Sequence, residues 1–166
     1  MEKLKQTYNI LHVETFNSEK KRSGVLVKKN ADNTIHVHWK GAAEMILAMC
    51  SNYYESDGEV RLMDEDARSA MEKIIEGIAA SSLRCIAFAH KQVLEEEREG
   101  NDDQGNCGRR IEDEGLTLLG IVGLKDPCRP GTQMAVHACK LAGVRIKMIT
   151  GDNVFTAKAI ATECGI

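Results

Sequence analysis

The stretch that most constrains the fold lies near the C-terminus, where an apolar, β-prone run ends in Thr150, Gly151 and Asp152. Residues 144–149 are typical of a strand, and the helical pattern of residues 154–161 follows at once. In parallel α/β folds, ligands collect where a strand's carboxyl end meets a helix N-terminus, because unpaired N–H groups and the helix dipole favour phosphate there. Gly151 allows close backbone approach, and Asp152 suits either a cation or a cap on the helix. The stretch therefore predicts a phosphate site at a strand tip.

Composition narrows the functions open to the chain. With 166 residues and 43% hydrophobic content it can build one sizeable core or two small ones. A net charge of −3 and a pI near 6.0 argue against a general nucleic-acid binder. No apolar run approaches the roughly 20 residues of a membrane span, and residues 1–6 lack a signal-peptide core, so we expect a soluble polypeptide. Six dispersed cysteines without a Cys-x-x-Cys pair indicate reduced thiols.

An antiparallel meander is predicted for the first part of the chain. Its three β-prone segments are separated by turn-forming residues and cover residues 8–16, 25–28 and 34–39. His36 and His38 would share one face of the third strand, but two ligands do not make a metal site, so no metal is expected. We expect residues 40–42 to break the sheet before a short helix over residues 43–50, followed by a polar loop from Ser51 to Gly58.

Further helices and strands follow by pattern. Apolar residues at helical spacing predict a helix over residues 64–81, and two apolar runs predict strands over residues 83–90 and 116–124. Arg84 stands near the start of the first run, and a buried strand rarely holds an unpartnered arginine, so we expect it to face a cleft or an anion. The acidic run of residues 95–106 is typical of a surface loop.

The final segment is predicted to begin at a hinge. Pro127 and Pro130 fix the backbone and forbid continued strand pairing. A helix over residues 132–142, capped by Gly143, then leads into the strand and helix described first. This order is half of a doubly wound domain. We therefore expect two domains, residues 1–125 and residues 126–166, the second of which is too short to be complete.

Four stretches share one explanation, and they are residues 16–21, 40–44, 82–85, and the pair 126–129 with 150–153. Their order and spacing resemble the cytoplasmic catalytic portion of the P-type cation-transport ATPases. The similarity is greatest to the calmodulin-regulated, plasma-membrane-type (type IIB) calcium pumps, in particular the plant autoinhibited subgroup. The resemblance implies an α/β (α+β) fold. In it an antiparallel sheet flanked by helices forms a nucleotide-binding domain, joined to a partial haloacid-dehalogenase-like phosphorylation domain.

The resemblance also implies an ATP site in the first domain. Phe16 would stack on adenine, and Lys21 and Lys40 would line the same pocket. Gly41 would let the backbone approach the base, and Arg84 would contact the phosphates. The full implied set is Phe16, Lys21, Lys40, Gly41, Ala42, Arg84 and Ile86. Plainer roles remain open for three of these: a core aromatic for Phe16, a solvated edge lysine for Lys40 and an ion-pair partner for Arg84.

On the phosphorylation side, the resemblance implies roles for Asp126, Thr150, Gly151 and Asp152. Thr150 would hydrogen-bond the transferred phosphoryl group, while Asp126 and Asp152 would organise the hinge and the Mg-ATP phosphates. The family's nucleophilic aspartate lies in an Asp-Lys-Thr-Gly-Thr motif, which this sequence lacks. Its Gly-Asp-Gly-x-Asn-Asp motif, which supplies a Mg²⁺ ligand, is also missing. The chain is therefore expected to be a catalytically inactive fragment that binds ATP without turnover.

For the parent pump, the resemblance implies Ca²⁺ export driven by ATP through an aspartyl-phosphate. The implied partners are the actuator and transmembrane domains and, in the parent only, calmodulin. The implied location is the cytosolic face of a plasma membrane or endomembrane. Two other functions stay open. One is a soluble haloacid-dehalogenase-like phosphatase, and the other is a non-catalytic truncated product acting by interaction.

Overall fold

The computed structural model describes residues 6–81, 83–93, 113–125 and 128–166. Its internal contacts divide the chain into two compact units. The first unit comprises Met1–Arg68 and Ala87–Ile121, and the second comprises Ser69–Ile86 and Val122–Ile166. In the described residues no helix is both long and apolar enough to cross a membrane.

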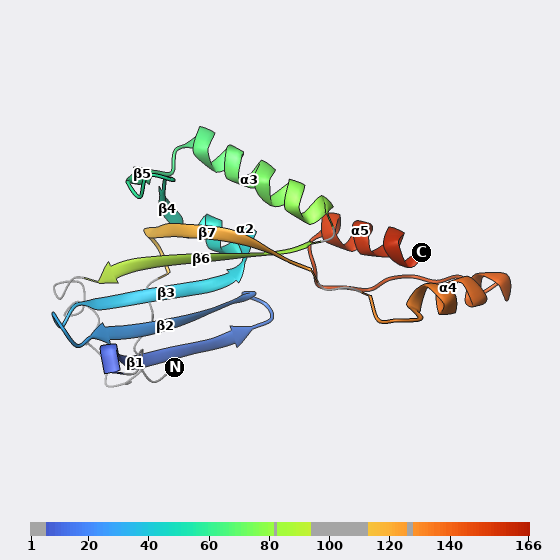
Figure 1. Cartoon of the computed structure of the whole chain (residues 1–166), viewed down its shortest axis with the longest axis horizontal. Helices are drawn as coiled ribbons and strands as arrows, with labels where there is room; N and C mark the ends of the chain where they lie inside the picture. Colours follow the sequence, from blue (N-terminus) through green and yellow to red (C-terminus); the bar gives the residue numbers. More distant parts are fainter. Residues whose placement is uncertain (1–5, 82, 94–112, 126–127) are drawn as a thin grey trace. The chain divides into compact units, whose positions relative to one another are not determined.

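The antiparallel meander is confirmed and consists of β1 (Tyr8–Asn17), β2 (Arg22–Lys29) and β3 (Ile35–Ala42) (Figure 1). Alternate residues of β3 are buried, with Ile35, Val37 and Trp39 at most 4% exposed. Such a period of two is what packs one face of a sheet on a core. The apolar alternation in the sequence therefore sets which face of the meander is buried.

The expectation that residues 40–42 break the sheet is wrong. β3 continues through Ala42, and Gly41 lies opposite Arg22 in the ladder with β2. The backbone N–H of Ala42 donates to the carbonyl oxygen of Lys21 at 2.9 Å. The glycine therefore carries strand pairing onward instead of ending it, and α2 (Ala43–Ala48) begins at the very next residue.

Two strands were missed. β4 (Cys50–Tyr54) occupies the stretch that we expected to be a helix end and a polar loop, and β5 (Val60–Leu62) follows that loop, where no element was predicted. β4 pairs in parallel with β7 (Leu116–Lys125) and antiparallel with β5. Most residues of these two strands are partly or fully exposed, so no apolar alternation marks them in the sequence. Their pairing depends on a strand far along the chain, which a local pattern cannot reveal.

The remaining predictions for helices and strands before residue 126 are largely confirmed. α3 (Glu65–Ala80) matches the helix expected over residues 64–81, although Ile75 and Ala79 are buried while Ile74 is 49% exposed. β6 (Leu83–Val93) and β7 are the two apolar strands. The seven strands follow the order β1-β2-β3-β6-β7-β4-β5. The acidic run of residues 95–106 lies outside the described residues.

In the second unit the two helices are confirmed and the strand between them is not. α4 (Thr132–Leu141) ends before Gly143, whose φ of 73° is the expected left-handed cap geometry. α5 (Val154–Cys164) follows. Residues 144–150 form no strand, since within the described residues no neighbouring strand pairs with them, and Ile149 is 96% exposed. A β-prone run without a partner cannot form a ladder.

Candidate nucleotide site

The ladder register gathers most of the proposed ATP residues at one end of the meander. Phe16 is the last residue but one of β1, and Asn17 pairs with Arg22 at the start of β2. Arg22 in turn pairs with Gly41, and the adjacent Ser23 pairs with Lys40. The pairing of β1 with β2 and of β2 with β3 therefore brings five residues to the same edge, entirely within the first unit: Phe16, Lys21, Lys40, Gly41 and Ala42. We call these five residues the Phe16–Lys40 cluster.

The turn that carries Lys21 is held by Asn17. The side-chain oxygen of Asn17 accepts hydrogen bonds from the backbone N–H groups of Glu19 at 2.8 Å and Lys20 at 3.0 Å. Its carbonyl oxygen accepts from the N–H of Lys21 at 2.7 Å. Lys21 adopts a positive φ of 50°, a conformation uncommon for residues other than glycine. The position of Lys21 is thus set by a turn that Asn17 stabilises by accepting three hydrogen bonds.

Gly41 is required by backbone packing. A Cβ added at this position would lie 2.5 Å from the carbonyl oxygen of Lys21 and 2.8 Å from the Cα of Arg22. These atoms belong to backbone and cannot move aside as a flexible side chain could. The structure therefore shows a close approach between β3 and the Lys21 turn at Gly41, and the approach of Gly41 to a base stays a prediction. It fixes Lys40 beside that turn.

Two side chains of the cluster, those of Phe16 and Lys40, are exposed, and Lys21 is half-buried. Phe16 is 66% exposed, which rules out the core-aromatic role. Lys40 is also exposed, as an edge lysine would be. An aromatic ring open on one face, with ammonium groups at the same edge, is an arrangement that can stack a base and attract polyphosphate. The ring of Phe16 and the side chain of Lys40 are thus both accessible from solvent.

Arg22 supports this edge and was missed by the sequence reasoning. Its guanidinium lies 4.9 Å from the ring centroid of Trp39 and donates to Asp113 at 2.6 Å and to the sulfur of Met49 at 2.7 Å. The side chain is only 13% exposed, and within the described residues its Nε has no hydrogen-bond partner. The basic run of residues 19–22 is a weak signal of a functional site, but no local pattern shows that Arg22 is the residue of this run whose side chain is largely buried.

Arg84 forms a separate cluster with Asp152 in the second unit. Its guanidinium lies 3.2 Å from a carboxylate oxygen of Asp152, and the two side chains are 50% and 26% exposed. The ion-pair role that stayed open for Arg84 is thus present. The N–H of Asp152 donates to the hydroxyl oxygen of Thr150 at 3.0 Å, which closes a short turn ahead of α5. Thr150, Asp152 and Arg84 therefore form one polar group, and Gly151 lies between the first two in the sequence.

The start of α5 is anchored by residues that the sequence reasoning did not single out. The cap of this helix is Asn153, whose side-chain oxygen accepts from the N–H of Phe155 at 2.8 Å, so the cap role that we expected for Asp152 is wrong. Thr156 is 2% exposed and donates to the carbonyl oxygen of Leu83 at 3.2 Å. This bond ties α5 to the residue preceding Arg84. Asp126 lies outside the described residues, and Ile86 is half-buried in β6.

A row of rings crosses the first unit away from the cluster. His36 and His38 stack at 6.4 Å between centroids, His38 and His90 at 5.9 Å, and His90 and Tyr54 at 5.7 Å. Burial, followed by repulsion from His90 and His36, lowers the pKa of His38. Throughout the part of the chain that the structure describes, no three His, Cys, Asp or Glu side chains are placed to hold a metal ion.

Comparison with known proteins identifies similar sequences. A family model described as P-type ATPase, cytoplasmic domain N, matches residues 1–131. "Calcium-transporting ATPase 12, plasma membrane-type" from Arabidopsis thaliana is 66% identical over 166 residues, which are 100% of this chain and 15% of the relative. "Calcium-transporting ATPase 7, plasma membrane-type" from Oryza sativa subsp. japonica is 53% identical over 163 residues, which are 98% of this chain and 15% of the relative. The chain thus spans about 15% of the length of these curated relatives.

Proposed function

The chain belongs to the P-type ATPases, and on this premise we propose that the Phe16–Lys40 cluster binds the adenine nucleotide of the family's cytoplasmic domain N. The observation that carries the proposal is the register at the end of the meander. It places an exposed aromatic ring and two lysines at one edge, with Gly41 packed on the Lys21 turn. The match to domain N over residues 1–131 covers this whole cluster.

The chemistry of the cluster suits a purine nucleotide. Stacking of adenine on Phe16 would contribute about 1–3 kcal/mol. Lys21 and Lys40 would attract the phosphates, and because Lys40 is exposed, its share of this attraction should weaken as salt is added. The small side chain of Ala42 would leave room for the base. The site would thus recognise the base by shape and the phosphates by charge.

We propose that residues 126–166 are part of a haloacid-dehalogenase-like phosphorylation domain, and residues 1–125 part of the nucleotide-binding domain. The support is the polar group ahead of α5, where the backbone N–H of Asp152 donates to the hydroxyl oxygen of Thr150 and the carboxylate of Asp152 pairs with Arg84. Thr150 would contact the transferred phosphoryl group. Arg84 would exchange the carboxylate of Asp152 for ATP phosphates, with Ile86 lining the site. Asp126 would help to organise the hinge, and Mg²⁺ would enter with ATP.

For the whole protein, we propose ATP-driven transport of Ca²⁺ across a membrane, because the relatives are named plasma-membrane-type calcium-transporting ATPases. The remainder of such a pump would be the chain's structural partner, and calmodulin would be a partner of the pump. These residues would stand on its cytosolic side. The domain N match over residues 1–131 favours this function over a soluble phosphatase and over a product that acts only by interaction.

Calorimetric titration with Mg-ATP tests the nucleotide site. Phe16→Ala should weaken binding about 5–150-fold, the equivalent of about 1–3 kcal/mol of lost stacking. Lys40→Ala should also weaken binding, and the loss of affinity should be larger at low salt than at high salt. Ile10→Ala and Lys28→Ala are matched controls, since Ile10 lies toward the opposite end of β1 and Lys28 pairs with Ile35 at the opposite end of the meander. Equal affinity in Phe16→Ala and in Ile10→Ala would show that the base binds elsewhere.

A further inference from the structure

Two cysteines from different parts of the second unit meet side by side. The Sγ atoms of Cys128 and Cys164 are 2.6 Å apart, although the residues are 36 positions apart in the sequence. Cys128 lies before α4, and Cys164 is the last residue of α5. A disulfide bond is about 2.05 Å long, so the sulfurs need to approach by only about half an ångström. The fold has therefore already brought these two sulfurs almost to bonding distance.

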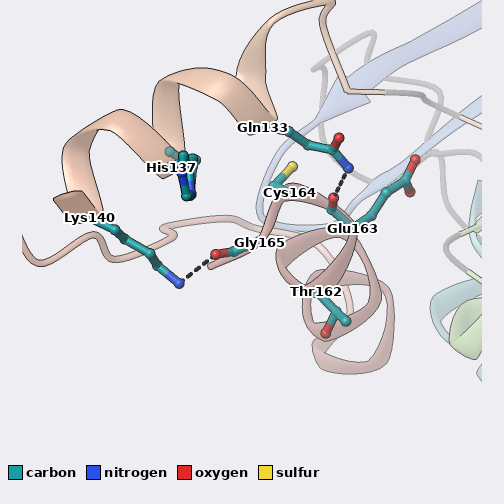
Figure 2. Close-up of a pocket in the computed structure, with 8 residues that line it drawn as sticks. Gln133, His137, Lys140, Thr162, Glu163, Cys164 and Gly165 are labelled. Atoms are coloured by element: carbon teal, nitrogen blue, oxygen red, sulfur yellow. Dashed lines mark hydrogen bonds between the residues drawn. The ribbon is translucent and has the colours of Figure 1, made fainter.

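Cys164 is held in place by polar bonds between the two helices. Figure 2 shows Gln133 and Lys140 reaching from α4 to the carbonyl oxygens of Glu163 and Gly165, each at 2.5 Å. These carbonyls belong to the end of α5, where a helix leaves acceptors without partners of its own. A hollow of about 400 Å³ lies beside them and is bordered by Cys164. The residues on both sides of Cys164 are thus tied to α4.

We propose that Cys128 and Cys164 form a reversible redox modification site, which closes to a disulfide when the chain meets an oxidant of the glutathione-disulfide class. Neither cysteine belongs to the Phe16–Lys40 cluster, and the proposal does not depend on nucleotide binding there. First, the thiolate of Cys128 attacks one sulfur of glutathione disulfide, so that a mixed disulfide forms and a glutathione thiolate leaves. Cys164 then gives its proton to that thiolate and attacks the sulfur of Cys128, releasing the second glutathione. Two protein thiols are oxidised and one glutathione disulfide is reduced to two thiols.

The surroundings of the two thiols set the order of these steps. Cys164 is 5% exposed, whereas Cys128 is only half-buried and so is the more accessible of the two thiols. The hydrogen bond to Cys128, together with burial, raises the pKa of Cys164 to about 11. Because the thiolate is the nucleophile, Cys164 is a poor first attacker at neutral pH. Cys128 is therefore the entry residue, and Cys164 resolves the mixed disulfide.

Peptide mapping after oxidation tests the proposal. Trypsin leaves Cys128 and Cys139 together in a peptide of residues 126–140 and Cys164 in residues 159–166, so a Cys139→Ser background makes the assignment unambiguous. This variant is incubated with glutathione disulfide, alkylated and digested. We expect the loss of two titratable thiols and a cross-link between the two peptides, and dithiothreitol should reverse both changes. Cys128→Ser should abolish the cross-link, whereas Cys85→Ser should keep it.

Three results would overturn the proposal. The first is a stable glutathione adduct on Cys128 with Cys164 still open to alkylation. The second is preferential cross-linking of Cys164 to another cysteine of the chain. The third is a disulfide that joins two copies of the chain on a non-reducing gel. If Cys128→Ser fails to fold by circular dichroism, the peptide map of the Cys139→Ser chain decides the question alone.

Discussion

At the scale of single residues, the arrangement of the Phe16–Lys40 cluster depends on one backbone contact. Gly41 lets β3 lie against the Lys21 turn, where any Cβ would come within 2.5 Å of a carbonyl oxygen. We therefore expect Gly41→Ala to destabilise the chain by about 1–3 kcal/mol, the usual cost of forcing an extra methyl into a packed site. Urea unfolding measures this change. It should be accompanied by weaker Mg-ATP binding, because the turn carrying Lys21 must shift.

Gly120→Ala is the matched control for this variant. Gly120 also lies in a strand of the first unit, but an added Cβ there meets no atom within 4 Å. This substitution should be neutral or slightly stabilising, since alanine restricts the unfolded chain more than glycine does. If the two variants lowered the unfolding free energy equally, the close contact at Gly41 would not be what stabilises the turn.

Residues differ in how far the sequence could predict their roles. The resemblance predicted Phe16, Lys21, Lys40 and Gly41 as one group, and the structure places them together at one edge. Arg22 escaped notice because its ion-pair partner, Asp113, lies 91 positions away. A pattern read within a few residues cannot reveal such a partner.

At the scale of elements, the row of rings across β3, β6 and β4 makes stability depend on pH. The pKa of His38 is lowered below its ordinary value of 6.5, first by burial and then by the neighbouring histidines. The pKa of His90 is also lowered, again chiefly by burial. A base with a lowered pKa binds fewer protons in the folded chain than in the unfolded one. The folded chain is therefore favoured above about pH 6.5 and loses stability as the pH falls through the folded pKa.

We predict a lower free energy of unfolding at pH 5 than at pH 8, measured by urea denaturation. The pKa of Asp32 is lowered from 3.8 in the folded chain. Asp32 therefore stays ionised between pH 5 and pH 8 in both the folded and the unfolded chain and does not contribute to the difference. His38→Gln should reduce the difference between the two pH values. His137→Gln, which changes an exposed histidine of α4, should leave it intact. A pH dependence that is the same in both variants would refute the role of His38.

Elements that follow a local pattern were predicted well, and those that depend on distant partners were not. The meander and α3 show apolar residues at the period of a strand or helix, and β6 and β7 each contain a short apolar run. β4 and β5 are short and largely exposed, and they exist because β7 pairs with β4. The opposite error concerned residues 144–150, where a β-prone run has no strand beside it within the described residues. Propensity alone decided neither case.

At the scale of the whole molecule, binding and chemistry are separable. The chain spans about 15% of the length of its relatives, and its sequence contains no Asp-Lys-Thr-Gly-Thr motif to supply the nucleophilic aspartate. We therefore expect Mg-ATP to bind without forming a phosphoenzyme. Incubation with ATP labelled in the γ-phosphate, followed by acid precipitation, should leave no label on the protein. Acid-stable, hydroxylamine-sensitive label on this chain would show that another residue accepts the phosphoryl group.

The central claim is that adenine nucleotide binds at the edge formed by β1, the Lys21 turn and the end of β3. Titration of the isotopically labelled chain with Mg-ATP, followed by nuclear magnetic resonance, tests this claim most directly. The account predicts dose-dependent shifts of the Phe16 ring and of the backbone amides of Lys21, Lys40 and Gly41, while Ile10 and Lys28 stay unchanged. Unmoved resonances of Phe16 and Lys40 at saturating nucleotide would contradict it.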